Sequence, residues 1–351
     1  MTAGSARQTI KAVWRSARMR VGGAAAVLIY HRISSMESDP ELLALSPERF
    51  DEQVAALSRD FNVVPVDEVF RLLDRPGRMP KRTVAITFDD GYADALHSAV
   101  PILHAHGVPG TLFLSSGAVD SPDEYWWDQL EQICFAPAEL PPTITIDTGA
   151  RTFSHSLGKD AIYPPETAMR DASWNVTQPT PGGRQRLYLE LASFMRQLPP
   201  AERNPAMASL LKQTGAAPTT RTSHRTLDAA EVALLSRDPL IGLGGHTIDH
   251  AVLSACSTEE QRHQIHDDKL RLEQLCERRL TSFSYPHGGF DDFNAESRRL
   301  VQAAGYEGAC TTDSDICVAW GDRFRVPRYL PRDMSADDLS AKLARWLDEG
   351  R

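Results

Sequence analysis

The chain reads Val84-Ala85-Ile86-Thr87-Phe88-Asp89-Asp90-Gly91-Tyr92, so two adjacent carboxylates directly follow a β-branched, apolar run. The run predicts a strand, because β-branched and aromatic residues favour extended backbone. Apolar residues then recur at helical spacing from Asp94 to His106, which predicts a helix after the strand. Barrels and open α/β sheets bind their ligands at the carboxyl ends of such strands. The stretch therefore predicts a parallel α/β fold with a site at Asp89 and Asp90.

Two histidines four residues apart, His246 and His250, follow a second short apolar run, which ends in glycines at residues 239–245. The spacing lets both imidazoles face one way on a helical turn. One carboxylate and two imidazoles make a three-ligand set that leaves a metal position open, and a spare carboxylate beside it can act as a base. Singly, Asp-Asp-Gly is usually a turn and His-x-x-x-His is more often a solvated or structural pair. Together at strand ends, they indicate metal-assisted hydrolysis.

These motifs resemble those of the polysaccharide deacetylases, carbohydrate esterase family 4, which share the chitooligosaccharide-deacetylase homology domain. Thr87–Tyr92 and Gly245–His250 are similar to the two metal motifs of the family, and Ser284–Gly289 is similar to the third. Val27–Arg32 is similar to the opening strand of the bacterial branch that deacetylates exopolysaccharide or capsular polysaccharide. The resemblance therefore extends beyond the two metal motifs.

The resemblance covers roughly residues 27–130 and 225–335 and implies an irregular (β/α)7–8 barrel, an α/β fold. The residues between these parts mix loop-forming and helical patterns, so we expect a mixed loop and helical insertion that acts as a lid over a sugar cleft. Within it we expect a hairpin around 143–153 and helix across 185–213. The expected organisation is a basic N-terminal segment at 1–24, the barrel at 25–335 with its insertion at about 131–225, and a C-terminal helix at 336–351.

The resemblance also implies a division of labour among the motif residues. Asp90, His246 and His250 would hold a divalent metal, with Zn²⁺ as the expected ion and Co²⁺ or Ni²⁺ as alternatives that suit the same ligand types. Asp89 would be the general base that activates water against an acetamide carbonyl. The backbone N–H of His287 would help to stabilise the oxyanion.

The sequence departs from the family pattern at two places. The third motif of the family has an arginine where this chain has Ser284, and the C-terminal Leu-x-His motif that supplies the general acid is absent from 324–329. If the motif order is permuted, the first strand supplies that histidine, and His31 becomes the acid that protonates the leaving amine. The alternative for His31 is a strand-end histidine that bonds only to backbone.

Two arginines near the C-terminus are candidates to replace the missing motif arginine. Either Arg328 or Arg325 can pair with the Asp89 carboxylate and orient it, and Arg328 matches the bacterial branch better. The alternative for each is a surface or structural arginine.

Aromatic residues beside the motifs are candidates for contact with sugar rings. Trp126 and Trp127 can stack on sugar or pack a helix onto the barrel, and packing is the safer expectation for at least one of them. The residues expected to bind substrate are Tyr92, Trp126, Trp127, Tyr285 and Pro286.

Composition and charge exclude some classes of function. The net charge of −9 argues against nucleic-acid binding as the main function, because phosphate contacts need a basic face. The five cysteines are odd in number and show no close metal-type spacing, so no disulfide framework is implied. The sequence gives no evidence of an obligate protein partner.

The N-terminal residues carry several arginines ahead of an apolar stretch, which superficially resembles a signal peptide. Cleavage there would remove the strand that carries His31, so we reject that interpretation and expect a cytoplasmic protein or one at the inner face of the membrane. No apolar run approaches the roughly 18–20 residues that a membrane-spanning helix needs. Residues 9–20 could form a basic helix that contacts a membrane surface, or simply a frayed tail.

The favoured function is metal-dependent removal of N-acetyl groups from N-acetylhexosamine units of a polysaccharide or a lipid-linked oligosaccharide. One alternative keeps the fold and the metal but hydrolyses a small non-peptide amide. The other is a catalytically weakened sugar-binding protein, which Ser284 keeps open.

Overall fold

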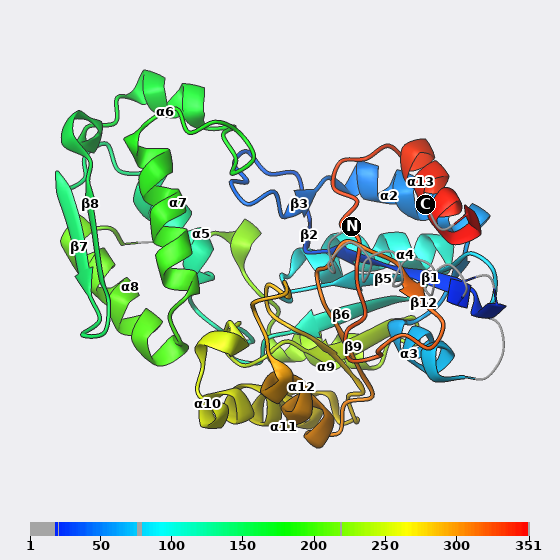
Figure 1. The fold of residues 1–351 in the computed structure, drawn as a ribbon. Coiled ribbons are helices and arrows are strands. Elements are labelled where there is room, and N and C mark those ends of the chain that lie inside the picture. The colour runs from blue at the N-terminus through cyan, green and yellow to red at the C-terminus, as the bar shows by residue number, and fades with distance from the viewer. Residues whose placement is uncertain (1–17, 20, 76–78, 218–219, 350–351) are drawn as a thin grey trace, which may run out of the picture.

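The computed structural model describes residues 18–19, 21–75, 79–217 and 220–349 (Figure 1). A mainly parallel sheet of eight strands runs through the barrel lobe in the order β11-β10-β9-β6-β5-β1-β12, with β4 paired to β5. Only β12 runs antiparallel to its neighbour, β1, among the strands described in this sheet. The strands are β1 (Ala24–Tyr30), β4 (Asn62–Val63), β5 (Thr83–Phe88), β6 (Gly110–Leu114), β9 (Ile241–Gly245), β10 (Ser282–Ser284), β11 (Gly308–Cys310) and β12 (Cys317–Val318).

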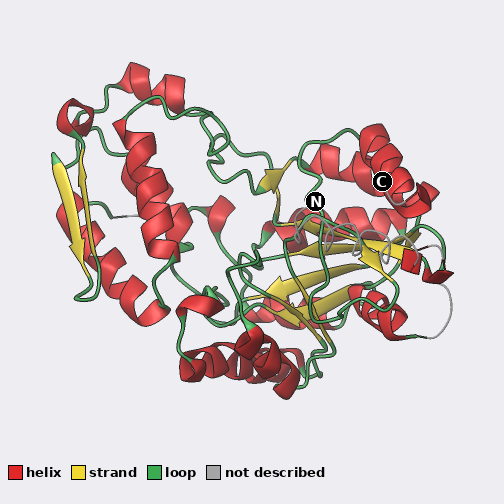
Figure 2. Ribbon diagram, in the orientation of Figure 1, coloured by secondary structure: helices red, strands yellow, loops and turns green. Residues whose placement is uncertain are grey.

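An extended segment at 324–329 links β11, at one edge of the curled sheet, to β1, next to the other edge. Val326 forms a parallel bridge with Cys310 in β11, and Tyr329 forms one with Leu28 in β1. The sheet therefore curls into a half-barrel, with helices packed outside it (Figure 2), which confirms the predicted fold class.

Apolar burial on both faces explains why the central strands form. Every residue of β1 and of β5 is buried, as expected for parallel strands that are covered on both sides. The helices and helical turns of this lobe are α2 (Pro47–Asp60), α3 (Val66–Asp74), η1 (Ala95–Ala99), α4 (Val100–His106), η3 (Thr222–His224), α9 (Ala229–Ser236), η4 (Leu253–Ala255), α10 (Thr258–Arg262), η5 (His263–Asp267), α11 (Asp268–Cys276), α12 (Ala295–Ala303) and α13 (Ala336–Glu349). A short parallel pair, β2 (Arg32–Ile33) and β3 (Ala44–Leu45), follows β1.

The insertion forms a second lobe with a hydrophobic cluster of its own (Figure 1, green). Leu187 and Leu191 are fully buried in this cluster. The predicted hairpin is confirmed, and the predicted helix at 185–213 is divided in two because Pro199 and Pro200 lack the N–H groups that a continuous helix needs. The elements are α5 (Trp126–Phe135), β7 (Thr143–Asp147), β8 (Thr152–Ser156), η2 (Gly158–Ala161), α6 (Pro165–Asp171), α7 (Gly183–Arg196) and α8 (Pro200–Thr214).

The ends of the chain are only partly covered by the structure. Residues 1–17 and 20, which hold most of the basic segment considered for membrane contact at 9–20, lie outside the described residues, so that contact stays a prediction. Among the described helices, none combines the length and the apolar character needed to cross a membrane. All five cysteines are buried and free, in agreement with the absence of a disulfide framework.

Candidate active site

The two adjacent carboxylates lie at the carboxyl end of β5, and both are buried. Asp90 has φ +72°, a left-handed backbone conformation that residues other than glycine rarely adopt. Gly91 follows it with φ +70°. A Cβ on Gly91 would meet only the flexible end of Leu114, so it is the left-handed conformation that favours glycine there. The turn therefore sends the Asp89 and Asp90 side chains to different partners.

Asp90 and the two histidines form a buried three-ligand cluster. Asp90 Oδ1 lies 3.4 Å from His246 Nε2 and 3.3 Å from His250 Nε2. His246 Nδ1 lies 2.7 Å from the Ser284 carbonyl oxygen, which can only accept, so Nδ1 carries the proton and Nε2 is left free as a ligand. Asp90 Oδ1 is buried without a hydrogen-bond partner among the described residues. An orphaned carboxylate oxygen facing imidazole nitrogens fits a divalent cation.

The charge states of Asp90 and His250 also suit metal binding. Burial alone would raise the pKa of Asp90, but His250 and His246 outweigh it and hold that pKa well below its usual range. Burial lowers the pKa of His250 despite the opposing effect of Asp90, which favours the neutral imidazole. A carboxylate and a neutral imidazole are the forms that bind a metal. At His246, by contrast, the Asp89 and Asp90 carboxylates outweigh burial and raise the pKa, so a cation would have to displace a proton from that imidazole.

The two histidines face the same way without a helix between them. Residues 246–250 form a bend after β9, and Thr247 and His250 have φ +66° and +48°. The prediction of a helical turn is therefore wrong, because left-handed backbone at these residues breaks the helical path. Arg203 stabilises the bend by donating a hydrogen bond from Nη2 to the Asp249 carbonyl at 2.6 Å.

Asp89 is held by a buried arginine from the segment that links β11 to β1. Arg328 Nη1 and Nη2 each lie 2.6 Å from one carboxylate oxygen of Asp89. Ser284 completes the network, since it accepts from Arg328 Nη2 at 2.7 Å and donates to Asp89 Oδ2 at 3.1 Å. Burial would raise the pKa of Asp89, but Arg328 and His246 outweigh it and leave that pKa below its usual range. Arg325 instead lies 3.3 Å from Asp313 at the surface.

The other two motif histidines also line the site. His31 lines the same cavity as the Asp89 and Asp90 carboxylates, and its Nδ1 is buried with no hydrogen-bond partner among the described residues. His287 has φ +58°, and its ring lies 4.7 Å from that of His250. In the described part of the chain, nothing accepts a hydrogen bond from its backbone N–H, whereas its carbonyl accepts one from Thr312 Oγ1.

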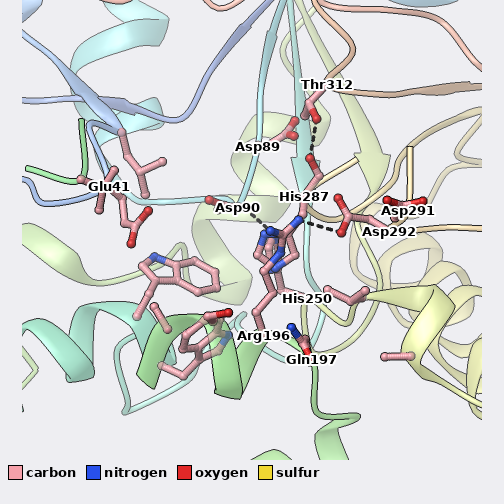
Figure 3. Close-up of a pocket in the computed structure, with 18 of the residues that line it drawn as sticks. Glu41, Asp89, Asp90, Arg196, Gln197, His250, His287, Asp291, Asp292 and Thr312 are labelled. Carbon is pink, nitrogen blue, oxygen red and sulfur yellow. Dashed lines mark hydrogen bonds and ion pairs between the residues drawn. The ribbon is translucent and has the colours of Figure 1, made fainter. Parts of the chain in front are cut away.

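A cavity of about 650 Å³ opens over these residues (Figure 3). Its walls combine the barrel with α5 and α7 of the insertion, and Trp126 and Trp127 are among the lining residues. Trp127 is buried and stacks on Tyr125, which is the packing role expected of at least one of the two.

Tyr92, Tyr285 and Pro286 do not line the cavity. Tyr92 and Tyr285 are fully buried. Tyr92 accepts a hydrogen bond from Trp127 Nε1 at 2.8 Å and donates to Asp128, so it supports the wall from behind.

Several charged or polar residues of the cavity carry no motif in the sequence. Arg196 at the end of α7 lies 2.7 Å from Asp292 in the loop after the third motif, and this ion pair links the two lobes at the cavity. The adjacent acids after the third-motif glycines were visible in the sequence, but nothing indicated which insertion residues would face them. The unpredicted lining residues are Glu41, Arg151, Arg196, Gln197, Asp291 and Asp292.

A second buried acidic cluster, Asp128, Glu131 and His224, lies beside α5. Arg221 Nη1 lies 2.8 Å from Glu131, and a nearby arginine, Arg32, adds positive charge. Burial raises the pKa of Asp128 to about 8, while burial and the two arginines lower that of His224 to about 3. Asp128 is therefore mainly protonated at neutral pH and Glu131 is already paired with Arg221, so this cluster does not resemble the first one as a cation site.

Comparison with known proteins places these features in a family. The family model described as polysaccharide deacetylase matches residues 76–140 and 198–309, half of the chain. The matched parts contain Asp89, Asp90, His246 and His250. The unmatched stretch between the two parts lies in the insertion lobe.

Individual relatives agree with this match. YxkH of Bacillus subtilis (strain 168), a protein assigned to the polysaccharide deacetylases, is 26% identical over 108 residues, which span 30% of this chain and 37% of that protein. Among solved structures, the deacetylase PplD of Streptococcus pyogenes superposes with a TM-score of 0.55 at 17% identity, covering 91% of this chain and 98% of that one. A de-N-acetylase of Aggregatibacter actinomycetemcomitans also gives 0.55, at 14% identity and with 90% and 99% coverage. At such identities the structural likeness supports the fold.

Proposed function

The chain belongs to the polysaccharide deacetylase family, and from this premise we propose that it hydrolyses N-acetyl groups from N-acetylhexosamine units of a polysaccharide or a lipid-linked oligosaccharide in a metal-dependent reaction. The observation that carries the proposal is the buried cluster of Asp90, His246 and His250 beside a second carboxylate, Asp89, that Arg328 orients. All but the arginine line one cavity of about 650 Å³.

Asp90, His246 and His250 are the residues that would hold the ion, and an oxygen and nitrogen donor set of this kind suits Zn²⁺, with Co²⁺ or Ni²⁺ as alternatives. A bound divalent ion polarises the acetamide carbonyl and acidifies water at the site. The Ser284 carbonyl contributes by fixing the tautomer of His246, so that Nε2 points to the cluster without a proton.

Asp89 is the proposed general base. A carboxylate can accept about four hydrogen bonds, so the contacts with Arg328 and Ser284 leave it room to take a proton from water that attacks the carbonyl carbon. The bidentate guanidinium fixes the orientation of the carboxylate and keeps it ionised at neutral pH, where it must act.

His31 is the proposed general acid, which donates a proton to the amine as the carbon–nitrogen bond breaks. Its position directly after β1, in the same cavity lining as both carboxylates, supports the permuted motif order. The backbone N–H of His287 is the proposed donor to the oxyanion. Trp126, which is half-buried, offers aromatic surface to a pyranose ring, and the buried Trp127 supports it from behind.

The test is acetate release from N-acetylglucosamine oligomers by protein that has been stripped of metal and then resupplied with Zn²⁺ or Co²⁺. We expect release only after resupply, because the amide carbonyl is otherwise not activated. Stripped protein that releases acetate at the original rate would contradict metal dependence. Metal binding without acetate release from any N-acetylated sugar would contradict the proposed substrate and favour a small amide instead.

A further inference from the structure

A half-buried carboxylate, Glu41, faces the same cavity as the metal-ligand set. Figure 3 shows its side chain pointing into the cavity, with Asp90 between it and His250. Glu41 lies outside the motifs that identify the family and outside the matched residues. Its position on the cavity wall nevertheless puts a negatively charged acceptor where a substrate of the proposed reaction must lie.

The turn that carries Glu41 has a left-handed backbone residue and is stabilised by hydrogen bonds to a side chain. Leu42 has φ +55°, a left-handed conformation that costs a residue other than glycine free energy. The Asp39 carboxylate compensates by accepting hydrogen bonds from the N–H groups of Leu43 at 3.0 Å and Ala44 at 2.8 Å. Backbone strain that the surroundings maintain is typical of residues held in place for function.

The insertion lobe fixes the same turn from the other side. The hydroxyl of Tyr188, a buried residue of α7, donates to Glu41 Oε1 at 2.7 Å. The Val176 N–H donates to the Pro40 carbonyl at 2.9 Å. Glu41 is thus held between the two lobes rather than lying on a free loop, and its second carboxylate oxygen is left for a ligand in the cavity.

The surroundings of Glu41 indicate which ligand groups would satisfy it. Burial raises the pKa of Glu41 despite the Tyr188 hydrogen bond, which marks a carboxylate with fewer donors than it would have in water. Arg196 of α7 is the cation whose charge acts on Glu41, and it is already paired with Asp292. Hydroxyl groups on a sugar ring that rests against Trp126 would supply the missing donors.

We propose that Glu41 is a specificity-determining residue that accepts hydrogen bonds from ring hydroxyl groups of the N-acetylhexosamine unit being deacetylated, with Tyr188 as its positioning residue. This inference rests on the proposed function. It extends that function by assigning sugar recognition to a contact that the insertion lobe completes, so that a small amide without ring hydroxyls would gain nothing from Glu41.

The first test compares Glu41→Ala with wild type on an N-acetylglucosamine oligomer. Loss of a hydrogen bond to a charged acceptor should decrease kcat/KM by about 10- to 100-fold. The decrease should come mainly from a higher KM, since the hydroxyl contact is made equally in the ground and transition states. Tyr188→Phe should shift KM in the same direction by a smaller factor. The matched control is Glu37→Ala, an exposed glutamate of the same loop that does not line the cavity.

A substrate series separates recognition from a general structural effect. Substrates that lack the C3 or the C6 hydroxyl on the reacting ring should be poorer than the parent for wild type, and at least one of these penalties should vanish in Glu41→Ala. Penalties of the same size in both proteins would overturn the proposal, as would a Glu41→Ala enzyme with unchanged KM.

Direct binding distinguishes failure of this inference from failure of the proposed function. The affinity of Asp89→Asn protein for the oligomer, measured by calorimetry, should fall when Glu41→Ala is added. A wild type that binds the oligomer through Glu41 but releases no acetate would reject the deacetylase function and retain the recognition role. A wild type that releases acetate, with affinity independent of Glu41, would retain the function and reject this inference.

Discussion

At the scale of single residues, the site depends on how Asp89 and Asp90 are separated in role. Asp90 faces two histidines, whereas Asp89 faces a guanidinium and a serine hydroxyl. The buried Asp89–Arg328 pair is the more costly arrangement, because both charges lose their water and must be satisfied by each other. Its geometry, bidentate and shared with Ser284, meets that requirement.

Removal of the buried guanidinium should therefore damage both folding and activity. We expect Arg328→Met to lower the free energy of unfolding by about 3–5 kcal/mol, because it leaves the Asp89 carboxylate buried and unpaired. Acetate release should fall with it, since the base loses its orientation. Urea denaturation and initial rates measure the two effects. Arg325→Met is the matched control, because its surface pair with Asp313 should contribute less than about 1 kcal/mol. Equal effects from the two variants would contradict the assignment of Arg328.

The role proposed for His31 can be separated from simple damage to the site by the choice of leaving group. An amine must be protonated as it leaves, whereas the phenolate of an activated aryl acetate need not be. His31→Ala should lower N-acetyl hydrolysis by about 10²- to 10⁴-fold and leave aryl acetate hydrolysis much less affected. Parallel rate measurements on the two substrate types check this. A similar loss on both would indicate that His31 is not the acid.

At the scale of elements, the start of α9 shows how local sequence chemistry is reinforced by packing. Asp228 and Glu231 form a capping box, and Arg225 adds two hydrogen bonds of 2.7 Å to the Glu231 carboxylate. These bonds outweigh burial and lower the pKa of Glu231 to about 2. Because the folded-state pKa lies below the unfolded value, the stabilisation is complete above about pH 4.5 and is lost as the pH falls toward 2.

Glu231→Gln should remove this pH-dependent contribution. We expect it to lower the free energy of unfolding at pH 7 by about 1–2 kcal/mol, after allowance for partial exposure, and to make stability less dependent on pH between 5 and 3. Urea midpoints across that pH range measure the effect. Glu296→Gln is the control, a partly exposed glutamate in the first turn of α12 that pairs with Arg299. If the stability of wild type and of Glu231→Gln depended on pH in the same way, the lowered pKa of Glu231 would be contradicted.

Elements with a strong local pattern could be predicted from the sequence, and those fixed by distant contacts could not. Capping boxes at Asp228 and Ser257, the 143–156 hairpin and the buried strand before Asp89 all follow from neighbouring residues. The bend at 246–250 depends on positive φ angles and on a hydrogen bond from Arg203 in the other lobe. The spacing of its histidines alone suggested a helix, because nothing local reports that contact.

At the scale of the whole molecule, the chain forms two lobes (Figure 1). Each lobe has hydrophobic clusters of its own, and residues of both line one cavity. Side-chain contacts that cross between them include Tyr188–Glu41 and Arg196–Asp292. The metal ligands and the base all belong to the barrel, whereas α7 of the insertion supplies much of the opposite wall. This arrangement separates the residues of hydrolysis from many of those that contact the rest of the substrate.

The separate clusters predict that the insertion lobe can be loosened without loosening the barrel. Leu187→Ala should destabilise that lobe by about 2–5 kcal/mol, because it leaves a cavity among fully buried side chains. Hydrogen exchange should accelerate across 126–214 and remain slow in β1 and β5, and KM for the oligomer should rise while metal affinity is kept. Leu28→Ala, in β1 of the barrel, should give the reverse pattern. Uniform acceleration after either substitution would show one cooperative unit.

Only some residues of the site could be identified from the sequence. Asp89, Asp90, His246 and His250 could be identified because each lies in a compact motif at a strand end. The choice between Arg328 and Arg325 required the path of the segment that joins β11 to β1. Glu41 and Arg196 could not be identified, because lobe packing rather than any local pattern brings them to the cavity.

The most direct test of the central claim is a comparison of metal content and acetate release for Asp89→Asn and Asp90→Asn, with circular dichroism to confirm that both are folded. Asp89→Asn should keep the metal content of wild type and release no acetate above background, because the base is lost and the ligands remain. Asp90→Asn should lose both, because the carboxylate ligand is gone. Metal retained with full activity in Asp90→Asn, or acetate release unchanged in Asp89→Asn, would contradict the separate roles on which the account depends.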